Sequence, residues 1–436
     1  MSHRHRRPRP ALVLASSLGL LGAATLPELR AASTAWPGWR GPARDAVSTE
    51  TGLAAAWAPA GPPLLWKAGG MGAGFSSVAV VDGRIYTMGD RDGAQHLLAV
   101  DASDGSLVWK ARVGPVWNDE YGGSRGTPTV DGGSVYALGT EGDLVAVDAA
   151  TGKERWRRRL PSDFGGQVMS MWKWSESPLV DGERVIVTPG ARDAALVALD
   201  KATGKELWRA AIPELGPAGR DGAGYSSIVV SNASGVKHYV QLLGRGLVGV
   251  RASDGQFLWG YNRVANNVAN ISTPIVRANW ALASTGYQTG TGLVELQKGG
   301  EGLQASELYF LGAKTFANHH GGMVLVGNHV YGGNGQSKGF PTCFEFVTGK
   351  LAWGGDIRNA GTGSAAVVYA DGHLYFRYQN GVVILIQATP EGYREKGSFT
   401  IPDVVKPSWS HPVIVGGRLY LREQDMLYVY DVRRPA

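Results

Sequence analysis

Five segments of the chain repeat one pattern: LAVDASDGSLVW (98–109), VAVDAATGKERW (145–156), VALDKATGKELW (197–208), VGVRASDGQFLW (248–259) and CFEFVTGKLAW (343–353). Each holds an apolar run, a Thr-Gly or Asp-Gly turn and a second short run that ends in tryptophan. The closing tryptophans are separated by 47, 52, 51 and 94 residues, and the last interval is about twice the others. Self-similarity at this period indicates a repeat architecture rather than a series of unrelated domains.

Three degenerate copies complete the series, with Trp66, Tyr309 and Phe399 in the place of the closing tryptophan. An independent marker gives the same count, because an apolar strand and a tight turn precede the copies, as in TVDG (129–132), PLVDG (178–182) and VVYADG (367–372). Asp-Gly between apolar runs is a strong hairpin signal. Four strands per copy and eight copies predict an all-β fold, an eight-bladed β-propeller of four-stranded antiparallel blades.

The two ends of the repeat region predict how the ring closes. The last copy stops after its third strand, at residues 427–431, whereas residues 64–67 form a fourth strand without a blade. We therefore expect the N-terminal strand to complete the last blade by pairing with residues 427–430, which removes exposed sheet edges. Regular recurrence predicts that the closing aromatic residues pack between blades rather than on a ligand. These residues are Trp66, Trp109, Trp156, Trp208, Trp259, Tyr309, Trp353 and Phe399.

The first 35 residues are typical of an export signal: a basic start, an apolar run over residues 11–26 and small residues up to Ala35. They contain five Arg and one Glu, so their removal lowers the formal net charge from +6 to +2 and weakens any nucleic-acid interpretation. We expect a signal peptide (1–35), an ordered arm packed on the propeller (36–62) and the propeller itself (63–436). We further expect a monomer in the periplasm or outside a bacterium, with no transmembrane segment and no lipid anchor.

Function in a propeller is expected where the copies differ, and here they differ in the connections that precede each first strand. Those connections converge on one mouth of the axial channel. The expected ligand or partner rim comprises Arg125, Trp172, Lys173, Trp174, Glu176, Tyr225, Asn270, His319, His320, Arg358, Trp409 and His411.

Within this rim, Trp172 and Trp174 flank Lys173 in a cluster suited to a planar or carbohydrate-like ligand, or to a hydrophobic plug. Arginines suit carboxylates and phosphates, or internal ion pairs with Glu120 or Glu176. Because neighbouring residues of a strand face opposite ways, His319 and His320 are not expected to bind one metal ion.

The motif Ala-x-Asp-Ala-x-Thr-Gly-Lys-x-x-Trp resembles the pyrroloquinoline-quinone (PQQ) repeat of quinoprotein dehydrogenases and BamB-like assembly proteins, and the resemblance covers residues 64–431. It implies the fold more strongly than the function. Dehydrogenases of this family would hold PQQ and calcium on the axis with a catalytic aspartate. Their alcohol-oxidising branch uses a disulfide between adjacent cysteines, which a single Cys343 excludes.

These observations favour an exported, non-enzymatic binding or scaffold propeller with no catalytic residue, cofactor or metal, whose rim binds a protein partner or small ligand. The alternative is a PQQ- and calcium-dependent dehydrogenase that oxidises an alcohol or sugar. A hydrolase built on Glu120 and Glu176 is a third interpretation, although no spacing argument pairs these carboxylates.

Overall fold

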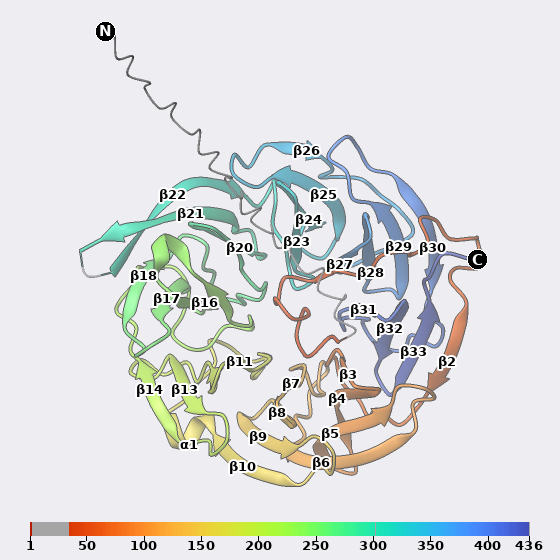
Figure 1. The fold of residues 1–436 in the computed structure, drawn as a ribbon, viewed down its shortest axis with the longest axis horizontal. Helices are drawn as coiled ribbons and strands as arrows, with labels where there is room; N and C mark the ends of the chain where they lie inside the picture. Colours follow the sequence, from red (N-terminus) through yellow and green to blue (C-terminus); the bar gives the residue numbers. More distant parts are fainter. Residues whose placement is uncertain (2–34, 301, 436) are drawn as a thin grey trace. The chain divides into compact units, whose positions relative to one another are not determined.

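The structure, a computed structural model, describes Met1, residues 35–300 and residues 302–435. The expected signal peptide lies almost wholly outside the described residues. Eight antiparallel sheets stand side by side in a ring (Figure 1), as the repeat count predicted. The described helices are the short α1 (Leu160–Phe164) and the 3-10 turn η1 (Ala233–Gly235). The prediction of an eight-bladed, all-β propeller is confirmed.

Each blade runs from an inner first strand to an outer fourth strand. Blades 1 to 4 comprise β3 (Ala79–Val81), β4 (Arg84–Arg91), β5 (Ala94–Asp101), β6 (Leu107–Pro115); β7 (Thr129–Asp131), β8 (Ser134–Leu138), β9 (Asp143–Asp148), β10 (Glu154–Arg159); β11 (Leu179–Asp181), β12 (Arg184–Val187), β13 (Leu196–Asp200), β14 (Glu206–Ala210); β15 (Val229–Ser231), β16 (His238–Leu243), β17 (Gly246–Arg251) and β18 (Phe257–Tyr261).

Blades 5 to 8 follow the same order, except that the fourth strand of blade 8 comes from the N-terminal side. They comprise β19 (Ile275–Arg277), β20 (Trp280–Thr285), β21 (Gly290–Gly299), β22 (Gly302–Gly312); β23 (Met323–Val326), β24 (His329–Asn334), β25 (Phe340–Glu345), β26 (Leu351–Trp353); β27 (Ala365–Ala370), β28 (His373–Tyr378), β29 (Val382–Gln387), β30 (Glu395–Thr400); β31 (Val413–Val415), β32 (Arg418–Glu423), β33 (Met426–Asp431) and β2 (Leu64–Ala68).

The ring closes through β2, which pairs antiparallel with β33. Leu64 lies opposite Tyr430 and Lys67 opposite Tyr428, as the sequence predicted. The guanidinium group of Arg422, on β32, reinforces this closure by donating to Thr87 Oγ1 at 2.7 Å and to the carbonyl of Gly72 at 2.7 Å. Blade 8 is therefore attached to blade 1 by a completed sheet and by buried hydrogen bonds.

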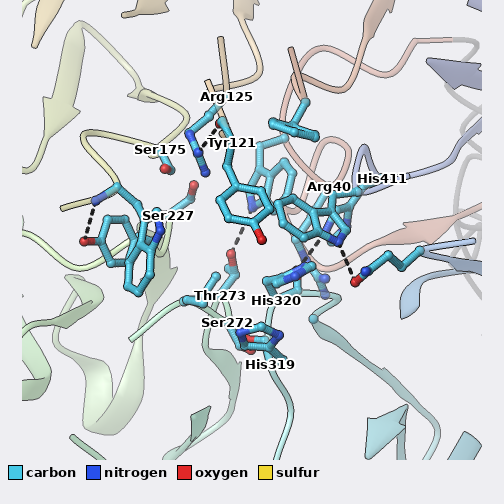
Figure 2. Close-up of a pocket in the computed structure, with 18 of the residues that line it drawn as sticks. Arg40, Tyr121, Arg125, Ser175, Ser227, Ser272, Thr273, His319, His320 and His411 are labelled. Carbon is cyan, nitrogen blue, oxygen red and sulfur yellow. Dashed lines mark hydrogen bonds between the residues drawn. The ribbon is translucent and has the colours of Figure 1, made fainter. Parts of the chain in front are cut away.

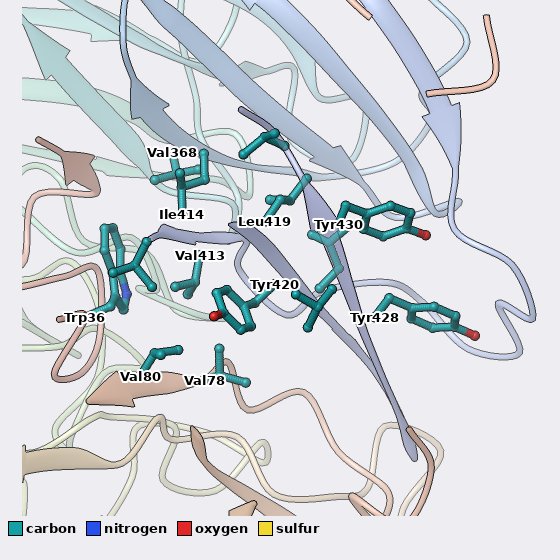
Figure 3. Close-up of a cluster of buried hydrophobic side chains, with 14 of the residues drawn as sticks. Trp36, Val78, Val80, Val368, Val413, Ile414, Leu419, Tyr420, Tyr428 and Tyr430 are labelled. Atoms are coloured by element: carbon teal, nitrogen blue, oxygen red, sulfur yellow. The ribbon is translucent and has the colours of Figure 1, made fainter. Parts of the chain in front are cut away.

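Apolar residues fill the space between neighbouring blades. Figure 3 shows one such cluster, in which Val413 and Tyr420 of blade 8 lie near Val78 and Val80 of the blade 1 segment, while Ile414 and Leu419 face Val368 of blade 7. Because the second and third strands of each blade are buried on both faces, they are rich in β-branched and aromatic residues.

The closing tryptophans lie on the glycine turns of the next blade. A Cβ atom added at Gly152 would lie 2.7 Å from ring atoms of Trp109, and the same holds for Gly204 and Trp156. The Trp109 indole also donates to the carbonyl of Ala149 at 3.0 Å. The tryptophan ring of one blade therefore packs against the Thr-Gly turn of the next blade.

Two copies depart from this pattern because their surroundings differ. Blade 5 replaces the short turn with the long β21–β22 hairpin, and Trp259 lies edge-on to His238 with ring centroids 6.1 Å apart. Trp353 in blade 6 lies edge-on to Tyr393, with centroids 6.0 Å apart. Phe399 in blade 7 keeps a glycine contact, with Gly61, and also packs against Trp57 of the N-terminal arm, with centroids 5.5 Å apart.

The arm over residues 36–62 lies across the innermost strands. Trp36 is buried and exchanges two backbone hydrogen bonds with Val80. Further along, β1 (Val47–Ser48) adds to blade 7 as a strand parallel to β27, so that this sheet has five strands. The loop between these two contacts carries Trp39 and Arg40 over the channel mouth.

Candidate ligand-binding cavity

A cavity of about 400 Å³ lies at one mouth of the propeller, beneath the arm (Figure 2). Most of its wall comes from the connections that precede the innermost strands, and these are the segments in which the repeats differ. The lining residues are Trp39, Arg40, Phe75, Tyr121, Arg125, Trp172, Ser175, Tyr225, Ser227, Ile271, Ser272, Thr273, Tyr287, His319, His320, Gly322, Gln379, Trp409 and His411.

Trp409 is the centre of an aromatic wall. Its ring centroid lies 5.1 Å from that of Phe75, 5.4 Å from that of Tyr121 and 4.6 Å from that of His320. The indole N–H donates to Gln379 Oε1 at 3.0 Å, which fixes the orientation of the ring. This wall offers flat, polarisable surface to a ligand.

Trp172 and Tyr225 form a second aromatic surface, with an edge-to-face arrangement at 5.9 Å. The Tyr225 hydroxyl lies 2.7 Å from Ser170 Oγ, and it accepts a hydrogen bond from the backbone N–H of Trp172 at 3.4 Å. The two surfaces come from different blades, so the cavity depends on the closed ring.

Arg125 contributes one of the two cationic groups in the lining. Its guanidinium lies 4.8 Å from the ring centre of Trp117 and 5.6 Å from that of Phe75, and one nitrogen donates to the carbonyl of Tyr121 at 2.6 Å. Burial lowers the pKa of Arg125 to about 10, so the group stays charged at neutral pH. Its Nε atom is buried and has no hydrogen-bond partner among the described residues.

Arg40 is the second cationic group and enters from the arm. It is 4% exposed, and Nη2 donates to the carbonyl oxygens of Met323 and Asp45. Nε and Nη1 are buried without a partner among the described residues. Burial lowers the pKa of Arg40 to about 10. The residue has φ of 61°, a left-handed conformation that costs free energy outside glycine.

Three imidazoles lie beside these cations and are neutral at neutral pH. Burial lowers the pKa of His319 to about 4 and, together with the charge of Arg40, that of His411 to about 3. The pKa of His320 is also lowered, by burial first and then by the other two imidazoles and Arg125. His319 is held by Ser364 Oγ at 2.9 Å and by the Tyr287 hydroxyl at 3.0 Å.

The lining has no carboxylate to balance the two guanidinium groups. Within the described part of the chain, no ion pair involves Arg40 or Arg125, and no group of His, Cys, Asp or Glu side chains is placed to hold a metal ion. Calcium prefers several carboxylate and carbonyl oxygens. The donor set therefore suits an anion and does not fit the calcium that a PQQ-dependent dehydrogenase would need.

Seven of the residues expected on the rim line this cavity: Arg125, Trp172, Tyr225, His319, His320, Trp409 and His411. The expectation that the adjacent histidines point apart is wrong. Residues 319 and 320 are not in a strand, so the alternation of side chains does not apply, and their ring centroids are 4.3 Å apart.

Five expected rim residues lie elsewhere because they have structural partners. Trp174 is buried in the core of blades 2 and 3, and its indole donates to the carbonyl of Thr188. Lys173 forms an ion pair with Glu141 at 3.0 Å. Glu176 is buried and accepts a hydrogen bond from Thr188, and Asn270 is buried and donates to the carbonyls of residues 243 and 244. Arg358 is exposed and lies over the Phe340 ring.

Sequence reasoning missed the contribution of the arm and of two hairpin turns. Trp39 donates from its indole to Thr273 Oγ1 at 2.9 Å and stacks near His411, at 4.4 Å between centroids. Tyr287 and Gln379 come from turns between the second and third strands of their blades. The unusual Trp-Arg pair in a Pro/Gly-rich arm was the available signal for the arm residues.

The fold and the cavity define a class: closed, tryptophan-docked eight-bladed propellers with a ligand-sized cavity at one mouth. Residues 93–354 match the family described as outer membrane protein assembly factor BamB, and the chain belongs to this family of PQQ-like repeat propellers. No helix within the described ranges has the length and apolar character needed to cross a membrane.

Two relatives show different extents of similarity. The outer membrane protein assembly factor BamB of Nitrosomonas eutropha is 28% identical over 164 residues, covering 36% of this chain and 34% of that protein. The chain thus spans about a third of that BamB. The tetrathionate hydrolase of Acidithiobacillus ferrooxidans is 24% identical over 440 residues, covering 87% of this chain and 78% of that enzyme.

Among solved structures, the quinohemoprotein alcohol dehydrogenase of Comamonas testosteroni superposes with a TM-score of 0.63 at 15% sequence identity. The match covers 93% of this chain and 82% of that one. At this identity the similarity concerns the fold alone.

Proposed function

We propose that this chain is an exported envelope propeller that binds a small anion in the cavity at its mouth. The observation that carries the proposal is the pair of buried guanidinium groups with unpartnered N–H groups, in a lining without a carboxylate. A buried charged donor without a partner is costly, and an anion satisfies it with charge-assisted hydrogen bonds. Arginine is well suited to oxyanions because its fork donates in a fixed plane.

The dimensions of the cavity support a small ligand rather than a protein segment. Pockets for small molecules commonly enclose about 300–1,000 Å³ and combine apolar walls with a few polar groups. This cavity, of about 400 Å³, has that composition. Since the net charge of the mature chain is close to zero, we do not expect nucleic acid to be a ligand. We also expect the chain to act as a monomer.

A sulfur oxyanion is the specific candidate that the comparisons support. A relative that aligns with most of this chain is named tetrathionate hydrolase. Tetrathionate carries a negative charge at each end, and this charge matches the cationic lining. Hydrolysis of a bound anion is therefore a second candidate activity for this chain.

The alternative of a PQQ-dependent dehydrogenase has less support. PQQ is itself a polyanion with a flat ring, which suits the arginines and the Trp409 wall. The calcium ion that such an enzyme would use finds no carboxylate in the lining. Relatives named as outer membrane protein assembly factors support a protein partner as the other occupant of the rim.

Isothermal titration of the purified mature protein tests the proposal. The panel contains sulfate, tetrathionate, a carboxylate and PQQ with and without calcium, each with matched ionic strength. We expect at least one anion to bind and Arg125→Gln to weaken it by about tenfold or more, the equivalent of one charge-assisted hydrogen bond. Arg358→Gln is the matched control, because Arg358 is exposed and lies outside the cavity.

Absence of binding by every anion contradicts the proposal, as does equal loss in both variants. Turnover of tetrathionate, followed by the release of product, distinguishes the hydrolytic candidate from simple binding. Dye-linked oxidation of alcohols or sugars in the presence of PQQ and calcium favours the dehydrogenase instead. N-terminal sequencing of protein from the periplasmic fraction tests the proposed export.

A further inference from the structure

The two cationic groups of the cavity come from unrelated parts of the chain. Arg125 precedes β7 in blade 2, whereas Arg40 belongs to the arm and is anchored on the backbone of Met323 in blade 6. The charges that act on the pKa of Arg125 are those of Tyr225, Asp119 and Asp90, and the charge that acts on the pKa of Arg40 is that of Asp45. The two guanidinium groups therefore reach the cavity from different segments, each with its own neighbours.

A continuous series of rings lies between the two guanidinium groups. From Arg125 the series passes to Phe75 at 5.6 Å, then to Trp409 and then to His320, at 5.1 Å and 4.6 Å between ring centroids. His411 Nε2 donates to the carbonyl of His320 at 3.3 Å, and the ring lies next to Arg40. Figure 2 shows Arg125 and Arg40 on different sides of the Tyr121 ring.

The residues around Arg40 hold its guanidinium group in a fixed position. Gly322, with φ of 71°, lies against the guanidinium, and a Cβ atom there would be 2.5 Å from Nη1. Arg40 itself holds a left-handed backbone, as does Tyr287 in the turn between β20 and β21, with φ of 53°. Strained residues of this kind persist where the surroundings over-determine them, and they concentrate at functional sites.

The other polar side chains of the cavity lining carry no charge at neutral pH. They include the three neutral imidazoles and hydroxyl groups such as that of Ser175, whose Oγ is buried without a partner among the described residues. Such groups, with the Trp409 wall, suit the uncharged and polarisable middle of a ligand.

We infer that the ligand is a two-ended dianion, with one oxyanion group at Arg125, the other at Arg40 and an uncharged middle against Trp409. This inference rests on the proposed anion-binding function and specifies the class of anion. A monoanion satisfies one guanidinium and leaves the other buried donor unpaired, so the second charge contributes affinity. Tetrathionate, α,ω-disulfonates and α,ω-dicarboxylates all belong to this class.

Titration calorimetry with 1,3-propanedisulfonate and 1-propanesulfonate tests the inference, because the two probes differ by one charged group. At constant ionic strength, we expect the disulfonate to bind wild-type protein at least tenfold more tightly than the monosulfonate. Arg125→Gln and Arg40→Gln are each expected to abolish that advantage while leaving weak binding of both probes. Arg358→Gln is expected to retain it. Arg40→Lys, which keeps the charge, is expected to retain most of it.

Equal affinity of the two probes for the wild type overturns the two-ended ligand and leaves the anion-binding proposal intact. Tighter binding of the disulfonate than of the monosulfonate by a folded Arg40→Gln or Arg125→Gln variant also overturns the two-ended ligand and leaves the anion-binding proposal intact. If Arg40→Gln does not fold, Arg125→Gln and Arg40→Lys still decide the matter. Failure of both probes and of every other anion to bind overturns the inference together with the proposed function.

Discussion

The contact between Trp109 and Gly152 gives a quantitative test of blade docking. Gly152 has φ of 71°, and an added Cβ atom would lie 2.7 Å from two atoms of the Trp109 ring. Gly83 is the matched control, with φ of 73° and nothing within 4 Å of the added atom. Gly83→Ala therefore isolates the backbone cost of the left-handed conformation, about 1–2 kcal/mol.

Gly152→Ala adds the cost of overpacking, about 1–3 kcal/mol, and strains the hydrogen bond from Trp109 to Ala149. We expect it to lower the free energy of unfolding by about 2–5 kcal/mol in urea denaturation, clearly more than Gly83→Ala. Trp109→Phe in the Gly152→Ala background provides a second check, since a smaller ring relieves the clash and the two changes are then less than additive. Equal destabilisation at Gly152 and Gly83 refutes the docking argument.

Three further predictions concern charge. Glu423→Gln leaves the buried Arg377 without the negative charge that now lies 2.7 Å away, and urea denaturation is expected to show a loss of about 3–5 kcal/mol. Burial raises the pKa of Glu176 from 4.5 to about 8. Between these pH values the folded protein keeps a proton that the unfolded chain releases, so the free energy of unfolding of the wild type falls as the pH rises. Glu176→Gln is expected to remove this pH dependence, so its free energy of unfolding rises by about 3–5 kcal/mol relative to that of the wild type between pH 4.5 and 8. Parallel pH profiles of the two proteins contradict this prediction. Anion affinity is expected to stay constant from pH 6 to 8, because both cavity arginines remain charged while His319 and His411 remain neutral, and calorimetry that detects proton uptake in this range opposes the assignment.

The sequence predicted the fold to the level of strand pairing because the repeat encodes it redundantly. Most copies carry their own turn glycine and closing aromatic residue, and the aromatic residue of one blade packs on the turn glycine of the next. The missing strand of the last copy and the spare strand at Trp66 then left one way to close the ring. Blade 7 has a fifth strand, β1, which was not predicted because it lies outside the repeats.

The cavity was only partly predictable, because its residues lie in connections without a repeated pattern. Position before the first strand identified Arg125, Trp409 and the three histidines, since topology alone directs these segments to one mouth. It did not separate lining residues from core residues: Trp174 lies three residues upstream of Ser177 and turns into the core of blades 2 and 3.

Arg40 was not identified because it reaches the cavity from outside the repeats. Its place depends on tertiary contacts, including the carbonyl of Met323, that no local pattern reports.

The most direct test of the two-ended anion site is a crystal structure of the mature protein with 1,3-propanedisulfonate. We predict one sulfonate within hydrogen-bond distance of Arg125, the other within hydrogen-bond distance of Arg40, and the propane segment against Trp409. Disulfonate bound outside the cavity, or bound in it through only one of the two arginines, would contradict the account.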